Sequence, residues 1–327
     1  MEYKGDILAI GTYGLIYENK RKDYVDKVIP IYRDESVSTQ IKAIKDEFYI
    51  NKVLSDIKVD LHLYHRIDNT MRLTVDCPFV PCIRDGLIEI YQEGLGDKLA
   101  ADIEKKNRRH RAMTDRAYIY TIEKVYNFFR DLVLPRNEMY VLISIYQLIE
   151  IYESLISLGI NVGHHDLHVN NVSYNVSREG IYSTKIIDFG MSCYFDSHLE
   201  ILSASGHDRD IPSLTSMQHA ILDIVSIIMS CNQYIRSSFL LDLICIGDPP
   251  CLNSCRPGYS QEDFFNDFYT LGGKYSYRSI KICKIHETVR LDEIKQEIKN
   301  YLEKEYRVRW KGIDSDSISN SSSIIIV

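Results

Sequence analysis

The first part of the chain alternates short apolar runs with turn residues, a pattern typical of antiparallel strands. The earliest apolar runs lie at 7–10, 15–17 and 24–29. After them, residues 38–54 carry apolar side chains at helical spacing among charged ones, which predicts an amphipathic helix. Further strands are predicted near 59–64, 72–75 and 87–91. We therefore expect residues 1–92 to form a small sheet lobe with one helix.

The rest of the chain changes to long helical patterns after Gly94 and Gly96. Apolar stripes predict three helices, at 138–158, 214–231 and 291–305. We expect a mainly helical lobe over 93–311 and a disordered polar tail over 312–327. No apolar run approaches the roughly 18 residues that span a bilayer, so membrane insertion is not expected.

Composition and charge narrow the function classes. Of the 327 residues, 45% are hydrophobic and 26% are charged, which excludes collagen-like, wholly disordered and coiled-coil chains. The formal net charge of -7 argues against a main role in nucleic-acid binding, and the basic run at 105–111 is expected to be a solvated face. We expect no stable nucleic-acid partner.

The cysteines and most histidines show no spacing that predicts a metal site. The eight cysteines are scattered, which favours reduced thiols in a soluble, intracellular protein, cytoplasmic by expectation. The nearest pair, Cys251 and Cys255, has no second pair that would complete a zinc site. His219 and the other histidines outside the segment 161–193 share no spacing and are expected to be structural.

The segment 161–193 carries the residue types that phosphoryl transfer needs. Such a reaction requires positioning and charge neutralisation, and therefore magnesium ligands and a group that orients the attacking hydroxyl. Asp166 is suited to orient the hydroxyl and accept its proton, while Asn171 and Asp188 are suited to hold magnesium. Two short strands are predicted between Asn171 and Asp188.

These residues form two motifs that resemble those of a known family. HHDLHVNN followed by IIDFG is similar to the H-R-D-L-x-x-x-N catalytic loop and the D-F-G motif of eukaryotic-type protein kinases. The resemblance is closest to divergent members of the kind found in large DNA viruses. It implies an α+β, two-lobed kinase fold with ATP and Mg2+ between the lobes and protein substrates as acceptors.

The resemblance predicts phosphate-binding residues upstream of these motifs. Ile10, Gly11, Thr12, Tyr13 and Gly14 resemble the glycine-rich loop, although Ala9 replaces its first glycine and an ordinary hairpin has the same pattern. Lys27 in YVDKVI resembles the lysine that contacts the α- and β-phosphates, with Lys22 as a nearby rival. Glu47 on the following helix is the acid expected to pair with Lys27, unless it is a solvated helix residue.

Two further resemblances place a hinge and a buried aspartate. The sequence IYQEGLGDKL at 90–99 resembles the hinge of casein-kinase-like enzymes, which implies that Glu93 to Leu95 bind the adenine edge. Asp223 resembles the aspartate at the start of the large buried helix beneath the catalytic loop. It is expected to accept hydrogen bonds from backbone amides of that loop, since an unpaired buried charge is costly.

Departures from the family pattern leave alternatives open. His165 stands where the motif has arginine, which makes activation by loop phosphorylation doubtful, and 210–213 is only a weak counterpart of A-P-E. His168 stands where serine/threonine kinases carry lysine, so it either acts beside Asp166 or packs beneath the loop. The chain is expected to be a serine/threonine-protein kinase. The alternatives are a choline- or aminoglycoside-type small-molecule phosphotransferase and a pseudokinase binding module.

Overall fold

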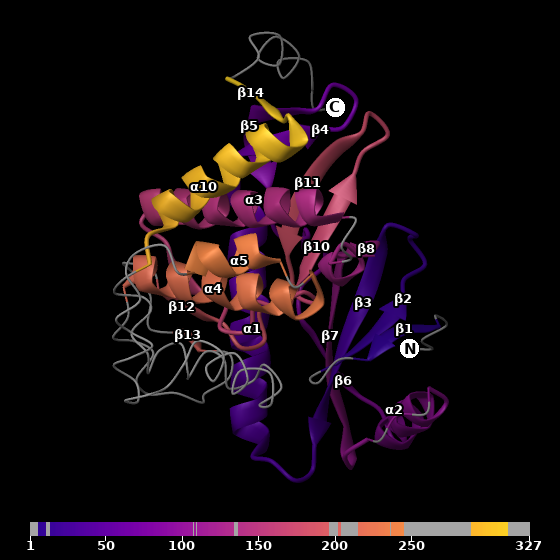
Figure 1. Ribbon diagram of the computed structural model, residues 1–327. Coiled ribbons are helices and arrows are strands. Elements are labelled where there is room, and N and C mark those ends of the chain that lie inside the picture. The colour runs from indigo at the N-terminus through magenta and orange to yellow at the C-terminus, as the bar shows by residue number, and fades with distance from the viewer. Residues whose placement is uncertain are drawn as a thin grey trace, which may run out of the picture.

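The computed structural model describes a mixed α+β protein with helices and mainly antiparallel sheets, in which β14 and β5 form a parallel pair (Figure 1). The residues that it describes are 6–10, 14–106, 108, 110–133, 137–195, 202–203, 215–235, 237–244 and 289–312. Gly11, Thr12 and Tyr13 of the expected glycine-rich loop lie outside the described residues, as do the A-P-E counterpart at 210–213 and the tail after residue 312.

A five-stranded antiparallel sheet contains the N-terminal strands. Its order is β1 (Ile7–Ile10), β2 (Leu15–Glu18), β3 (Tyr24–Tyr32), β7 (Met113–Glu123) and β6 (Ile88–Tyr91). Helix α1 (Val37–Asp56) covers one face of this sheet and α2 (Leu95–Glu104) covers the other. The first three strands and the helix after them are confirmed.

Strand alternation determines which side chains each helix covers. On β3, Val28 packs with α2, whereas Ile29 and Ile31 pack with Ile44 of α1. Lys27 has the same parity as Ile29, so it also faces α1. The sheet therefore directs Lys27 toward the helix that carries Glu47.

The hairpin of β4 (Lys58–His65) and β5 (Thr70–Pro78) corrects our expectation for the N-terminal lobe. We expected these strands in the first sheet, but they belong to a second sheet whose order is β14-β5-β4-β11-β10-β8. The remaining strands of this sheet are β8 (Asn127–Phe128), β10 (Val172–Val176), β11 (Ile181–Ile186) and β14 (Arg309–Lys311). Buried Val59, Leu61 and Tyr64 of β4 pack in the same core as α3, which explains why the hairpin lies there.

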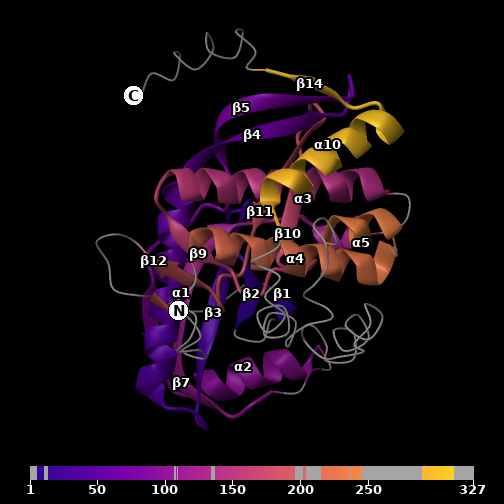
Figure 2. The same cartoon turned by 60° about the vertical axis from the view of Figure 1, so that its left-hand side comes forward.

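The largest core lies among the second sheet and three long helices. These are α3 (Glu138–Ser157), α4 (Ser216–Ile235) and α10 (Leu291–Tyr306), with the shorter α5 (Ser238–Ile244) beside them (Figure 2). Contrary to our expectation from the apolar runs, α3 is long and apolar enough to cross a membrane. However, 72% of its apolar stretch is buried inside the fold, and the core helices of soluble proteins are often as long and as apolar.

A third, small sheet adjoins the segment 161–193. Strand β9 (Asn161–Gly163) pairs with β12 (Cys193–Phe195), which pairs in turn with β13 (Leu202–Ser203). A short 3-10 helix, η1 (Phe129–Asp131), follows β8. Because β9 pairs with β12, the residues just before the HHDLHVNN motif lie next to the residues that follow the D-F-G motif.

Because β7 belongs to the first sheet, the boundary between the sheet lobe and the helical lobe differs from the one that we expected. We expected residues 93–123 in the helical lobe. Instead, α2 packs on the first sheet and β7 lies between β3 and β6 within it. The chain leaves this sheet after Glu123, through residues 124–126, and not near residue 92.

Candidate functional site

A pocket of about 510 Å³ collects most of the residues that the sequence motifs singled out. Its walls come from β1, β2, β3, α1, β7, the residues after β7, and the segments that carry Asn171 and Asp188. Ile10 and Gly14 of the expected glycine-rich loop line it. At Gly14, a Cβ atom would lie 3.2 Å from the Val28 carbonyl oxygen, so glycine permits the close approach of this loop to β3.

Lys27 is the charged centre of the pocket. Its Nζ lies 2.5 Å from Oε1 of Glu47 and 3.2 Å from Oδ1 of Asp188. This confirms the expected Lys27–Glu47 ion pair, and Glu47 is buried and not solvated. Burial would lower the pKa of Lys27, but the carboxylates of Asp188 and Glu47 outweigh it and raise this pKa well above its ordinary value. Lys27 is therefore a fixed cation.

Two neighbours hold this charge network in place. The hydroxyl of Tyr120 on β7 donates to Oε1 of Glu47 at 3.0 Å, in a buried contact that the sequence analysis missed. The ammonium of Lys27 lowers the pKa of the Asp188 carboxyl, so Asp188 is an anion at neutral pH. Asp188 has a φ of 62°, a left-handed conformation that is costly for a residue other than glycine and that aims it into the pocket.

The expected hinge residues Glu93 and Leu95 do not line the pocket. Leu95 begins α2 and is buried against the first sheet, while Glu93 is exposed just before it. The glycines that resembled a hinge serve the packing of α2. Gly94 has a φ of 74°, and a Cβ at Gly96 would lie 2.8 Å from the carbonyl oxygens of Met113 and Thr114, the first two residues of β7. Glu93 and Leu95 are therefore not among the residues that the structure brings to this pocket.

Residues 124–126 take the place that we assigned to the hinge. Lys124, Val125 and Tyr126 line the pocket and connect β7 to β8. The amide of Lys124 is bound to the Asp23 carbonyl, whereas no hydrogen bond to the backbone of Val125 occurs within the described part of the chain. The backbone of a pocket-lining residue that has no other hydrogen bond is available to the polar edge of a ligand. The signal in the sequence was the strand-like run at 113–123, which ends at this connection.

The loop that resembles the catalytic loop of kinases holds Asp166 and Asn171 together. Nδ2 of Asn171 donates to the backbone oxygen of Asp166 at 2.9 Å and to its carboxylate Oδ2 at 3.3 Å. The Asn171 carbonyl accepts from the Ile187 amide at 3.0 Å, which ties the loop to the residue before Asp188. Asn171 lines the pocket, and half-buried Asp166 adjoins it through Asn171.

His164 connects the two motifs by both ring nitrogens. Its Nε2 lies 2.9 Å from the Ile187 carbonyl oxygen, and its Nδ1 accepts from the Asp166 amide at 3.3 Å. These partners assign the proton to Nε2, because a carbonyl can only accept and an amide can only donate. The ring is fully buried and lies 5.0 Å from that of Phe189. His164 therefore positions the backbone at both ends of the site.

Helix α4 supports the loop from below with a row of polar residues. Asp223 accepts hydrogen bonds from the amides of His164 and His165, at 2.7 and 2.9 Å, and from the Tyr152 hydroxyl at 2.8 Å. This confirms the role expected for Asp223. Ser230 accepts from the Val169 amide at 3.2 Å. Asp223 and Ser230 are seven residues apart, so they lie on the same face of this mainly apolar helix. Of these two residues, the sequence analysis recognised only Asp223.

His168 lies beside the carboxylate of Asp166. Its Nε2 is 3.6 Å from Oδ2 of Asp166, and its Nδ1 accepts from the Asn170 amide at 3.1 Å. That acceptor role assigns the proton of the neutral ring to Nε2, the atom nearest Asp166. The side chain is 35% exposed, which argues against the alternative in which His168 packs beneath the loop.

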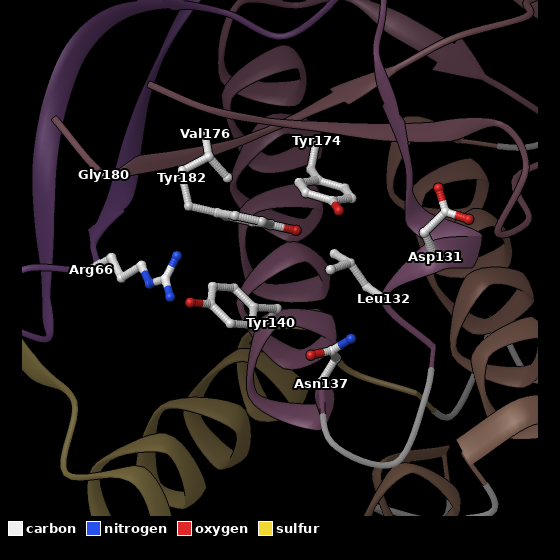
Figure 3. A pocket seen from close by; sticks show the side chains of 9 residues that line it. All are labelled: Arg66, Asp131, Leu132, Asn137, Tyr140, Tyr174, Val176, Gly180 and Tyr182. Carbon is white, nitrogen blue, oxygen red and sulfur yellow. The ribbon is translucent and has the colours of Figure 1, made fainter. Parts of the chain in front are cut away.

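A second pocket of about 310 Å³ lies away from these motifs (Figure 3). Its walls come mainly from Tyr140, Tyr174 and Tyr182, and the guanidinium of Arg66 points toward the Tyr140 hydroxyl on one side. The Tyr182 hydroxyl is already bound to Ser144 at 2.5 Å. This pocket lacks the convergent lysine and carboxylates of the larger one, so we place the candidate site in the larger pocket.

The structure thus joins most of the predicted site residues in one place. Lys27, Glu47, Asn171 and Asp188 contact or line the pocket, and Asp166 and His168 adjoin it. Glu93 and Leu95 lie elsewhere, and Tyr120 with residues 124–126 replaces them as unanticipated neighbours. Comparison of the chain with models of known protein families and with curated protein sequences gives no match.

Proposed function

We propose that this protein is a magnesium-dependent phosphotransferase with a kinase-like two-lobed arrangement, and that it transfers the γ-phosphate of ATP to serine or threonine hydroxyls of proteins. One observation carries the proposal. Lys27, whose side chain is 12% exposed, is paired with Glu47 and Asp188 and shares a pocket with Asn171, and Asn171 is hydrogen-bonded to the half-buried carboxylate of Asp166. These are the residue types that phosphoryl transfer uses for phosphate binding, metal binding and hydroxyl positioning.

The donor set at the pocket suits magnesium. Asp188 offers a carboxylate that is ionised at neutral pH. Because Nδ2 of Asn171 is committed to Asp166, the amide oxygen is the atom that Asn171 has left to offer. Carboxylate and amide oxygens are hard ligands of the kind that Mg2+ prefers. Bound there, Mg2+ would neutralise charge on the phosphates of ATP.

Each residue of the chain then has a separate task. Lys27 supplies a fixed positive charge for phosphate oxygens, and Glu47 and Tyr120 keep it in position. Asp166 orients an acceptor hydroxyl and takes its proton at a carboxylate oxygen, while the backbone of Val125 is suited to bind the adenine edge. His168 offers an N–H next to Asp166, where negative charge increases as the hydroxyl loses its proton.

The proposal is tested by incubating the purified full chain with MgATP labelled at the γ-phosphate, with separate pools of proteins and of small hydroxylated molecules. We expect label on serine or threonine of proteins, with none when EDTA replaces magnesium. Label on small molecules alone would support a small-molecule phosphotransferase. MgATP binding without transfer to any pool would support a pseudokinase, and absence of MgATP binding would refute the site.

Replacement of Lys27 by methionine should weaken MgATP binding and lower transfer by about 10²-fold, because methionine fills similar space without the charge. Titration of MgATP by calorimetry and steady-state transfer rates measure the two effects. The matched control is Lys22→Met, because Lys22 is exposed on the same hairpin and does not line the pocket. Equal losses in both variants would contradict the assignment of Lys27.

Replacement of His168 by alanine should lower the turnover number by about 10²-fold and raise the KM for ATP much less, because the charge beside it grows in the transition state. Steady-state kinetics, expressed per folded molecule after a thermal-unfolding check, measure the split. His168→Lys should restore transfer if the acceptor is a protein hydroxyl. An alanine variant that loses only thermal stability would assign His168 a packing role.

A further inference from the structure

A cluster of two histidines and a cysteine adjoins the loop that carries Asp166, and none of its members lines the pocket. His165 comes from the loop itself, Cys193 begins β12, and His219 lies on α4. One ligand-type atom from each lies within 4.8 Å of the others. Neither the pocket nor the proposed phosphoryl transfer uses any of the three side chains.

The distances within the cluster are close to those of a coordination shell. Nε2 of His165 lies 3.0 Å from Nδ1 of His219, and Sγ of Cys193 lies 3.3 Å from Nε2 of His165. Tetrahedral zinc bonds of ordinary length separate two nitrogens by about 3.3 Å and a nitrogen from a sulfur by about 3.6 Å. Sγ of Cys193 lies 3.9 Å from Nε2 of His219, the ring nitrogen that does not contact His165. Shifts of a few tenths of an ångström would bring the two contacts of His165 to zinc geometry, and a rotation of the His219 ring would aim one of its nitrogens at the same ion.

The surroundings fit a built site and not an accidental encounter. Cys193 and His219 are buried, and strand pairing of β12 with β9 brings Cys193 opposite Gly163. A Cβ at Gly163 would overlap Nε2 of His165 and lie 2.6 Å from Nδ1 of His219. The absence of a side chain at Gly163 is therefore what gives both imidazoles the space to face one another.

We propose that His165, Cys193 and His219 bind a divalent ion of the zinc class, with the fourth position open to water. Zinc favours this combination of imidazole and thiolate ligands, whereas magnesium favours oxygen. Binding replaces the thiol proton of Cys193 by the metal, and the proton passes to solvent. This site is separate from the proposed magnesium site, and the inference holds whether or not the chain transfers phosphate.

The metal would connect three segments that no covalent bond joins. It would hold the residue before Asp166 to the strand that follows the D-F-G motif and to the helix beneath the loop. In the sequence analysis, His165 replaced an arginine that pairs with a phosphorylated loop. A metal ion offers another way to fix the loop, one that needs no phosphorylation.

The test measures metal binding by the full chain and not activity. Protein is loaded with Zn2+, dialysed, and its metal content compared for wild type, Cys193→Ser and His219→Asn. The matched control is Cys77→Ser, because Cys77 is another buried thiol, with Sγ beside the carbonyls of Thr74 and Val75. We expect both cluster variants to lose one zinc ion per chain and the control to lose none.

A variant-free measurement covers the case in which the substitutions unfold the protein. X-ray absorption of the zinc-loaded wild type should show one sulfur and two imidazoles around the metal, and the Co2+ form should show a thiolate charge-transfer band. Cys245, Cys251, Cys255 and Cys283 lie outside the described residues, so a shell of several sulfurs would place the metal elsewhere and overturn the proposal. The proposal would also be overturned if the wild-type protein retained no zinc after loading and dialysis. The three residues would then form only a hydrogen-bonded His–Cys–His cluster.

Discussion

Replacement of Asp166 by asparagine should lower the rate of phosphoryl transfer by about 10² to 10⁴-fold while leaving MgATP binding nearly unchanged. Asparagine keeps the size of the side chain but cannot accept the proton of the acceptor hydroxyl. The carboxylate of Asp166 is half-buried, and it contacts Asn171 and His168, not Lys27. Its loss therefore removes an interaction that is made with the acceptor and not with the nucleotide.

Asp188→Asn is the comparison that makes this result specific. Asp188 contacts Lys27 at 3.2 Å and lines the pocket, so its loss should weaken MgATP binding as well as transfer. Calorimetric titration with MgATP and single-turnover transfer rates separate the two variants. Full activity of either variant would reject the mechanism, and loss of MgATP binding in Asp166→Asn would place Asp166 in the metal site.

Asp223→Ala should destabilise the protein by about 3 to 5 kcal/mol, an effect far larger than that of an ordinary surface substitution. The carboxylate is completely buried and accepts from the amides of His164 and His165 and from the Tyr152 hydroxyl. Burial raises the pKa of Asp223, and these three donors partly offset the cost. Alanine would remove the buried acceptor that these three donors share.

Urea unfolding followed by circular dichroism measures this loss of stability. The control is Asp242→Ala, because Asp242 lies exposed on α5 and should change the free energy of unfolding by less than about 0.5 kcal/mol. Because His165 adjoins Asp166, the Asp223 variant should also lose transfer activity in any fraction that remains folded. Equal stability of the two variants would show that the loop does not depend on Asp223.

Local patterns predicted much of the site, because its residues either are close in sequence or lie at the regular spacing of a strand or a helix. Alternation along β3 places Lys27 on the face that α1 covers, and helical spacing places Glu47 on the matching side of α1. The turn from Asp166 to Asn171 is local, and its two hydrogen bonds connect residues five apart. The four long helices at 37–56, 138–157, 216–235 and 291–306 follow from their apolar stripes, and their ends differ by a few residues at most from the predicted ones.

The hinge shows where local resemblance misleads. The sequence IYQEGLG has a strand followed by glycines, which is also the pattern of a strand that leads into a packed helix. Gly96 is needed because α2 approaches β7, and that contact joins segments that the sequence pattern does not connect. The connection that lines the pocket, at 124–126, follows β7, which pairs with β3 across about 90 residues of sequence.

The sequence by itself determined the four long helices with their apolar faces, the strands up to residue 91, and which polar residues stand in the loop at 164–171, but it did not predict β7. It did not determine partners. The alternation of apolar and polar residues shows that β4 and β5 each have a buried face, but it does not show which sheet they join. The reason is that the backbone hydrogen bonds of a strand are the same with any neighbour. Only packing against α3 chose the second sheet, and only the tertiary structure brought His165, Cys193 and His219 together from a loop, a strand and a helix.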